Sequence, residues 1–314
     1  MRAVLIVNPH ATSTTERRRD LLTHAFAGEL DLQVVHTAGR GHAADIAAAA
    51  AADGVALVLV HGGDGTVNET VNGLLAAGVR ADNPMLAVIP GGSTNVFARA
   101  VGVPADPTDA VEHLLSSLEA QRPPRSVSLG RAGQRYFTFN AGMGIDADVV
   151  RRVEQHRALG KPISNSLHVR QAIAAYRERN RGWSGPLTLT LPGTEPISGC
   201  RLAFVSNVSP WTYLHGRAIR TNPDTSADHG LGVFAATSLS APTVLRTVAQ
   251  LLRSKPGHGP HGSALIRADD VGWVRLQVAD PSGPGVGVQT DGDYLGEYTE
   301  VEFVSVPNAL KVLV

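Results

Sequence analysis

Two glycine-rich segments each follow a short apolar run and precede an amphipathic stretch. The first is HGGDGTVNE, at 61–69 after the apolar run 55–60, and the second is PGGSTNVFAR, at 90–99 after 85–89. A strand, a glycine-rich turn and a helix N-terminus in succession direct backbone N–H groups to one point, where they can hold phosphate. The two segments therefore predict an α/β fold with a phosphate-binding site.

The first segment also has the side chains that phosphoryl transfer needs. Gly62, Gly63 and Gly65 lack side chains, so a triphosphate could approach the backbone closely. Thr66 is a candidate cap of the following helix, and Asp64 would place a carboxylate beside a Mg²⁺-phosphate or an acceptor hydroxyl. The spacing matches neither Gly-x-x-x-x-Gly-Lys nor Gly-x-Gly-x-x-Gly, and a tight turn without ligand is the alternative for the glycines alone. The complete segment indicates a nucleotide-using kinase.

The string Gly-Gly-Asp-Gly-Thr-x-Asn-Glu at 62–69 resembles the signature of the diacylglycerol kinase catalytic domain family. That family includes sphingosine and ceramide kinases and is distantly similar to NAD kinases. Further blocks resemble it along most of the chain, namely Asn8-Pro9, Thr37, residues 140–147 and residues 290–293. The family's first loop usually reads Asn-Pro-x-Ser-Gly, and this chain departs from the end of it.

The resemblance implies ATP and Mg²⁺ as cofactors and a set of residues at the nucleotide. The implied nucleotide-binding residues are Asn8, Pro9, Thr12, Thr37, Gly62, Gly63, Asp64, Gly65, Thr66, Asn68, Glu69, Gly92, Ser93, Thr94 and Asn95. They fall in the first loop, the second loop and the two glycine-rich segments.

Two carboxylates are candidates for the catalytic base. Bacterial lipid kinases of the family carry Asp-Gly-Glu where this chain has Asp291-Gly292-Asp293, and their glutamate is treated as the general base, which implies Asp293. Sphingosine kinases are thought to use the aspartate of the Gly-Asp-Gly turn, here Asp64. A hairpin turn is the alternative for 291–293, because Asp-Gly favours the positive φ angles that hairpins require.

Two positions depart from the family at an accessory Mg²⁺ site. Val96 and His229 stand where relatives often carry aspartate. Mg²⁺ prefers hard oxygen ligands, so we expect this site to be weakened or lost. Asp228 remains a candidate ligand, with turn capping as its alternative, and Asp64 is a candidate ligand of the Mg²⁺ that accompanies ATP.

The pattern along the chain predicts two domains. Residues 1–130 alternate strands (3–7, 32–36, 55–60, 85–89) with helices (14–28, 42–52, 66–77, 94–101, 107–119), which predicts an N-terminal doubly wound parallel-sheet nucleotide-binding domain. Short apolar runs separated by Gly and Pro over 131–303 predict a C-terminal antiparallel β-sandwich domain, and the resemblance implies that this domain binds the lipid substrate. The resemblance implies that the tail 304–314 packs back on the first domain and that the active site lies in an interdomain cleft.

Composition excludes several other classes of protein. Basic and acidic residues number 28 each, so the chain lacks the positive charge typical of nucleic-acid binders. The single cysteine, Cys200, cannot form an internal disulfide, which favours a reducing compartment. No signal-peptide pattern follows Met1, and the apolar stretch 46–52 is too short to cross a bilayer. We expect a cytoplasmic protein that is peripheral on the inner face of the membrane.

A cationic segment is the candidate for that membrane contact. Residues 151–181 hold eight basic and two acidic residues, a local charge of plus six. This charge would suit anionic lipid headgroups, and a solvated helix face is the alternative.

The expected function is therefore that of an ATP-dependent lipid kinase acting on the hydroxyl of a diacylglycerol-like lipid. A sphingoid, ceramide, polyprenol or other acceptor on the same fold is one alternative. A nucleotide-binding pseudokinase that has lost activity is another. The sequence gives no indication of oligomeric state.

Overall fold

The structure is a computed structural model and describes residues 1–11, 22, 24–158, 187–214, 216–253 and 257–314. The chain forms two compact units. One consists of Met1–Leu129 with Pro307–Val314, and the other of Gly130–Val306. Two strands, β5 (Arg125–Ala132) and β18 (Glu300–Val312), have residues in both units.

The first unit is a parallel sheet with helices on both faces. Its strands lie in the order β2-β1-β3-β4, with the end of β18 beside β4 through Val312 and Leu86. The strand bounds are β1 Arg2–Val7, β2 Asp31–His36, β3 Leu57–Gly62 and β4 Met85–Pro90. The helices are α2 His42–Ala52, α3 Asp64–Leu74, α4 Val96–Ala100 and α5 Pro107–Glu119.

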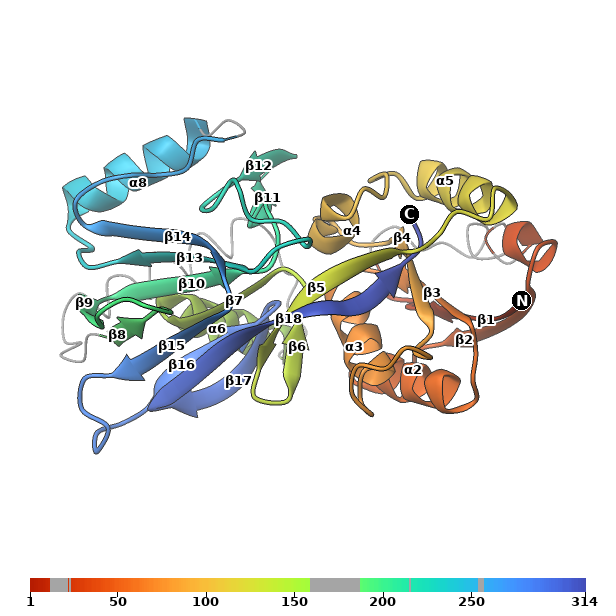
Figure 1. Ribbon diagram of the computed structural model, residues 1–314, viewed down its shortest axis with the longest axis horizontal. Helices are drawn as coiled ribbons and strands as arrows, with labels where there is room; N and C mark the ends of the chain where they lie inside the picture. Colours follow the sequence, from red (N-terminus) through yellow and green to blue (C-terminus); the bar gives the residue numbers. More distant parts are fainter. Residues whose placement is uncertain (12–21, 23, 159–186, 215, 254–256) are drawn as a thin grey trace. The chain divides into compact units, whose positions relative to one another are not determined.

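Alternating side chains of this sheet serve two cores. Leu5, Leu59 and Ile89 pack with Leu114 of α5, while α2 and α3 lie together on the other side of the sheet (Figure 1). Alanines form the buried side of α2, and a Cβ on Gly73 of α3 would lie 2.1 Å from the Ala44 carbonyl oxygen. The doubly wound architecture predicted from the sequence is confirmed.

The second unit is built from antiparallel sheets that share one core. One sheet has the strand order β14-β13-β10-β7-β16-β17. The strands β18-β15-β8-β9 pack against it across the common core. The bounds are β6 Arg135–Phe137, β7 Asn140–Gly144, β8 Leu187–Thr190, β9 Ile197–Cys200, β10 Leu202–Ser206, β11 Thr212–Leu214, β12 Arg217–Ile219, β13 Leu231–Ala236, β14 Leu265–Val271, β15 Trp273–Val278, β16 Val286–Thr290 and β17 Asp293–Tyr298. Their antiparallel pairing confirms the predicted fold class of this part.

Some elements differ from those predicted. Helix α3 begins at Asp64 rather than at residue 66, so the carboxylate belongs to its first turn. The predicted strand at 301–304 and the tail form one strand, β18, whose pairing with β15 ends at Val304, before Pro307. A helix that the sequence analysis does not predict, α8 (Ala241–Arg253), connects β13 with β14. Most of the predicted helix 14–28 lies outside the described residues.

Helix α6 (Ile145–Ala158) places a carboxylate beneath its first turn. Val286 and Val288 of β16 point into the core, so Gly287 and Gln289 point to the opposite face, where α6 packs. The Gln289 amide there donates a hydrogen bond to Asp146 of α6. Burial raises the pKa of Asp146 to about 7, and the hydrogen bond from Gln289 works in the opposite direction.

The shifted Asp146 predicts a pH-dependent stability. Its folded-state pKa lies above the ordinary value near 3.9, so folding favours the protonated form and its contribution declines as pH rises from about 4 to about 7. Asp146→Asn has no proton to lose, and its amide oxygen can still accept from Gln289. Relative to wild type, we expect this variant to gain a few kcal/mol of unfolding free energy (about 1.4 kcal/mol per pKa unit) between pH 5 and pH 8. Denaturant titrations at several pH values measure the difference, and parallel pH profiles would contradict it.

Candidate active site

The strand order of the first unit creates a switch point between β1 and β3. The chain leaves β1 for β2 on one side and leaves β3 for β4 on the other. In open parallel sheets, ligands bind at the carboxyl ends of the strands at such a point. Asn8 follows β1 there, Thr37 follows β2, and the two glycine-rich turns follow β3 and β4. The predicted first-unit residues that the structure describes therefore occur at this end of the sheet or in the first turns of α3.

The two glycine-rich turns contact each other backbone to backbone. The Gly91 amide donates to the Gly62 carbonyl at 2.8 Å. A Cβ on Gly91 would lie 2.9 Å from Gly62 Cα, and one on Gly92 would lie 2.8 Å from Gly63 Cα. The sequence analysis assigned Gly62 and Gly63 to the approach of a triphosphate. The structure adds a second reason for glycine at these positions, which is the close packing of the two turns. Gly65 differs, because no other part of the protein lies within 4 Å of a Cβ there.

The Asp64 carboxylate also joins the two turns. Its Oδ2 accepts a hydrogen bond from Thr94 Oγ1 at 2.8 Å, and its Oδ1 accepts one from the Phe97 amide at 3.4 Å. Asp64 is the first residue of α3, where a negative charge is favoured by the helix dipole. The carboxylate thus holds the second turn in register with the first.

Thr66 does not cap α3, so that prediction is wrong. The N-cap is Gly63, and Thr66 lies inside the first turn, where it is buried. Its Oγ1 instead accepts a hydrogen bond from Asn8 Nδ2 at 2.9 Å. The contact ties the loop after β1 to the turn after β3, on the two sides of the switch point.

Asn95 closes the second turn upon itself. Its backbone is left-handed, with φ 47°, and its amide bonds both backbone groups of Gly92 at 2.8 and 2.9 Å. Ser93 is exposed at the tip of the turn, and Val96 behind it is buried. Val96, which the resemblance placed at the accessory Mg²⁺ site, is thus an apolar core residue.

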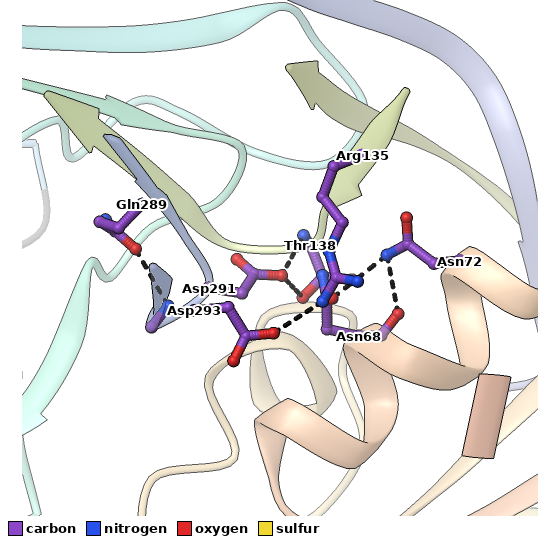
Figure 2. Close-up of polar contacts among 8 residues, drawn as sticks. Asn68, Asn72, Arg135, Thr138, Gln289, Asp291 and Asp293 are labelled. Atoms are coloured by element: carbon purple, nitrogen blue, oxygen red, sulfur yellow. Dashed lines mark hydrogen bonds and ion pairs between the residues drawn. The ribbon is translucent and has the colours of Figure 1, made fainter. Parts of the chain in front are cut away.

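The remaining first-unit candidates differ in accessibility. Pro9, Glu69 and Asn8 are partly exposed, while Thr37 is 8% exposed. Asn68 is fully buried, and its Oδ1 and backbone carbonyl accept from Asn72 Nδ2 at 3.1 and 2.9 Å (Figure 2). These contacts give Asn68 a role inside α3. Thr12 lies outside the described residues.

In the second unit, Asp291 and Gly292 form a two-residue turn between β16 and β17. Their φ angles are 49° and 81°, as a tight hairpin turn requires. The buried Asp291 carboxylate accepts four hydrogen bonds, from the amides of Thr138, Phe139 and Asn140 and from the Thr138 hydroxyl (Figure 2). Burial raises the pKa of Asp291, and the four donors favour its ionised form.

Asp293, the predicted base, forms an ion pair. Its Oδ2 lies 2.7 Å from an Arg135 guanidinium nitrogen (Figure 2), and the two side chains are 20% and 31% exposed respectively. No spacing or motif in the sequence indicated Arg135, which lies on the short strand β6, 158 residues before its partner. Asp293 is therefore accessible to a substrate, whereas Asp291 is committed to the turn.

Gln289 joins the two sequence blocks of the second unit. Its Oε1 accepts from the Gly292 amide at 3.0 Å, and its Nε2 donates to Asn140 Oδ1 at 3.1 Å. The Asn140 carbonyl accepts from the Asp291 amide at 2.7 Å. Residues 140–147 and 290–293, which were singled out separately in the sequence, thus form one hydrogen-bonded network. The predicted cleft between the two domains stays a prediction.

The described residues show no cluster of the side chains that most often hold metal ions. Within them, no three His, Cys, Asp or Glu side chains gather closely enough to hold an ion. Asp228 lies in the turn before β13, where its amide donates to Ser226 Oγ at 3.3 Å. No second described carboxylate, His or Cys joins Asp228 in such a cluster, so its role as a Mg²⁺ ligand stays a prediction, and Asp64 would need further ligands such as those of a nucleotide.

Known proteins resemble this chain in sequence and in structure. The family model described as "Diacylglycerol kinase catalytic domain" matches residues 2–123. A probable lipid kinase YegS-like of Chromohalobacter salexigens is 35% identical over 146 residues, 46% of this chain and 44% of that protein. The diacylglycerol kinase of Mycobacterium tuberculosis is 30% identical over 274 residues, 85% of this chain and 79% of that protein.

The crystal structure of a putative diacylglycerol kinase from Bacillus anthracis superimposes with a TM-score of 0.74 at 21% identity. The match covers 99% of this chain and 96% of that one, and it supports the fold of both units. The Mycobacterium tuberculosis relative is aligned over most of both chains. The chain belongs to the diacylglycerol kinase family.

Proposed function

We propose that this kinase transfers the γ-phosphoryl group of MgATP to the hydroxyl of a diacylglycerol-like lipid. The observation that carries the proposal is the Asp64–Thr94 hydrogen bond, which couples two glycine-rich turns at the carboxyl ends of β3 and β4. Phosphoryl transfer depends mainly on positioning and on electrostatic stabilisation of the phosphate oxygens. A rigid pair of turns at a helix N-terminus supplies both.

The exposed backbone at Gly65 is the proposed nucleotide contact. At Gly62 the space that a side chain would take is occupied by Thr66, and at Gly63 it borders the second turn. The corresponding space at Gly65 is open. The first N–H groups of a helix have no partner within the helix, so they can donate to phosphate oxygens. Mg²⁺ would arrive with ATP, which supplies most of its ligands and charge neutralisation.

For the acceptor, we assign the base to Asp293 and a positioning role to Asp64. Both oxygens of Asp64 already accept hydrogen bonds from the second turn. Asp293 is partly exposed, and Arg135 fixes the direction of its carboxylate. In the proposed step, the lipid oxygen bonds to the γ-phosphorus, the bond to the bridging oxygen of ADP breaks, and Asp293 takes the hydroxyl proton.

Incubation of the pure protein with labelled ATP and a panel of lipids in mixed micelles tests the proposal. We expect phosphate transfer to diacylglycerol in preference to sphingosine, ceramide and polyprenol. Preferred transfer to one of the other lipids would identify that lipid as the acceptor in place of diacylglycerol. Calorimetric MgATP binding without transfer to any lipid would indicate a nucleotide-binding pseudokinase. Gly65→Ala should fold normally, because its methyl group meets open space, yet weaken MgATP binding.

The role of Asp64 can be separated from that of its hydrogen bond. Asp64→Asn should lower turnover on the order of 10²-fold, because an amide presents one acceptor oxygen and no charge to Thr94 and Phe97. Thr94→Val removes the hydroxyl but keeps the shape, and Thr94→Ser keeps the hydroxyl. If Asp64 acts by positioning the second turn, Thr94→Val should reproduce much of the loss and Thr94→Ser should not. Equal activity of Asp64→Asn and wild type would eliminate both roles.

The assignment of Asp293 predicts a loss confined to the chemical step. Asp293→Asn should lower kcat by about 10²-fold or more with little change in the KM for ATP, while Asp293→Glu should remain substantially active. Asp82→Asn is the matched control, because Asp82 forms an exposed ion pair with Arg80 at 2.9 Å, and it should leave kcat unchanged. Normal turnover by Asp293→Asn would transfer the base role to Asp64.

A further inference from the structure

Helix α8 presents an apolar stripe to solvent. Leu245, Val248 and Leu252 are 70%, 45% and 39% exposed, and they make up three of the six exposed large apolar side chains in the described part of the chain. Their spacing of three and four residues places them on one side of the helix. Val244 and Leu251, on the adjoining arc, are half-buried. The apolar arc of α8 is therefore wider than the part that its own unit covers.

The sheet does not need this helix. Strands β13 and β14 are antiparallel neighbours, and such strands can be joined by a turn of a few residues. Instead, residues 237–264 leave the sheet and return, with the Thr237 amide donating to the Ala264 carbonyl at 2.9 Å where the excursion closes. Figure 1 shows α8 running alongside β14, the last strand of its sheet. The excursion places an amphipathic helix on an outer side of the second unit.

A cationic groove lies beside the apolar stripe. It has a volume of about 390 Å³ and lies between α8 and residues 257–261, with Arg246, Arg253, His258 and His261 in its lining. The Gln250 side chain fixes the far wall, since it donates to the His261 carbonyl at 3.2 Å and accepts from the His261 amide at 2.9 Å. Both arginines are exposed.

The stretch of chain that forms the groove has no acidic residue of its own, and Arg267 near its end pairs with Asp224 and Asp269 outside the stretch. Residues 229–268 contain no Asp or Glu, whereas a stretch of that length would hold about four if the chain's 28 acidic residues were evenly spread. The same stretch holds Arg246, Arg253, Lys255 and Arg267. In a chain with no net charge, this region therefore combines exposed apolar side chains with a local excess of cations.

We propose that α8 and its groove are the docking surface for an anionic lipid bilayer. The apolar stripe would enter the boundary between headgroups and acyl chains, and Arg246 and Arg253 would meet lipid phosphates in the groove. Such a combination of an apolar face and flanking cations is what holds amphipathic helices at membrane interfaces. No helix in the described ranges is long and apolar enough to span a bilayer.

This inference deepens the proposed function by naming the surface through which the enzyme reaches its substrate. It names a different surface from the contact expected from the sequence at 151–181, which stays a prediction. Arg151 of that segment lies 3.5 Å from Glu297 and 4.0 Å from Asp148, and residues 159–181 lie outside the described part of the chain. These carboxylates offset the charge of Arg151, as Asp224 and Asp269 do for Arg267, so the proposed docking surface relies on the exposed Arg246 and Arg253.

Vesicle flotation without ATP tests the docking surface. We expect wild type to bind vesicles of phosphatidylcholine with one-fifth phosphatidylglycerol, to bind pure phosphatidylcholine weakly, and to be released by salt. The triple variant Leu245→Gln, Val248→Gln, Leu252→Gln and the double variant Arg246→Gln, Arg253→Gln should each lower binding by roughly tenfold or more. These side chains are exposed, so thermal unfolding should remain that of wild type.

Matched controls remove the same groups elsewhere. Val79→Gln replaces an exposed apolar residue of the first unit, and the double variant Arg2→Gln, Arg122→Gln removes two exposed arginines. Both should float like wild type. Binding by the α8 variants equal to wild type, indifference to lipid charge, or an α8-dependent dimer in place of vesicle binding would overturn the proposal.

The outcome is distinguishable from that of the proposed function. Phosphorylation of a short-chain diacylglycerol in detergent micelles should be unchanged in the α8 variants, because none of their residues belongs to the candidate active site. Vesicle binding through α8 without turnover would refute the kinase step and leave the docking surface intact. Turnover with vesicle binding that requires Arg177, Arg179 and Arg181 in place of α8 would refute the docking surface and leave the kinase step intact.

Discussion

The close contact between two glycine pairs is the constraint on which the first unit's candidate site depends. Gly91 and Gly92 lie against Gly62 and Gly63 so closely that a single added carbon would overlap backbone atoms. This approach brings Thr94 Oγ1 within 2.8 Å of the Asp64 carboxylate. Larger residues in these turns would separate them, and the carboxylate would lose its partner. The glycines therefore position the site through packing, before any ligand is considered.

The second unit uses a carboxylate in a similar way. Asp291 is buried and accepts hydrogen bonds from three consecutive amides, which fixes the hairpin at the end of β16. Removing such an acceptor would leave several buried donors unsatisfied, at about 1–3 kcal/mol for each group. In each unit one aspartate organises a turn. In the Asp-Gly-Asp turn, this leaves the second aspartate, Asp293, to meet Arg135 near the surface.

The sequence predicted the elements that have strong local signals. The helices 42–52 and 107–119 have the predicted bounds. Alanine, the strongest helix former, dominates the first, and the second combines the Asp106 cap and Pro107 with a periodic apolar face. Contacts between distant segments were not predictable in this way. Arg135 with Asp293 and Asn8 with Thr66 are joined only by the fold. The packing of Gly91 against Gly62 was not predictable for the same reason, since the two glycines follow different strands.

Helix α8 shows a different limit, because its signal was present in the sequence. Val244, Leu245, Val248, Leu251 and Leu252 recur at helical spacing, and Pro242 occurs near the helix start. Short apolar runs between Gly and Pro elsewhere in this unit favoured strands and obscured that period. The same residues explain why the helix is only half covered. Five apolar positions span more of the helix surface than one edge of a sheet can bury, so the remainder needs a second apolar phase. We propose that the bilayer is that phase, because the proposed acceptor is a lipid.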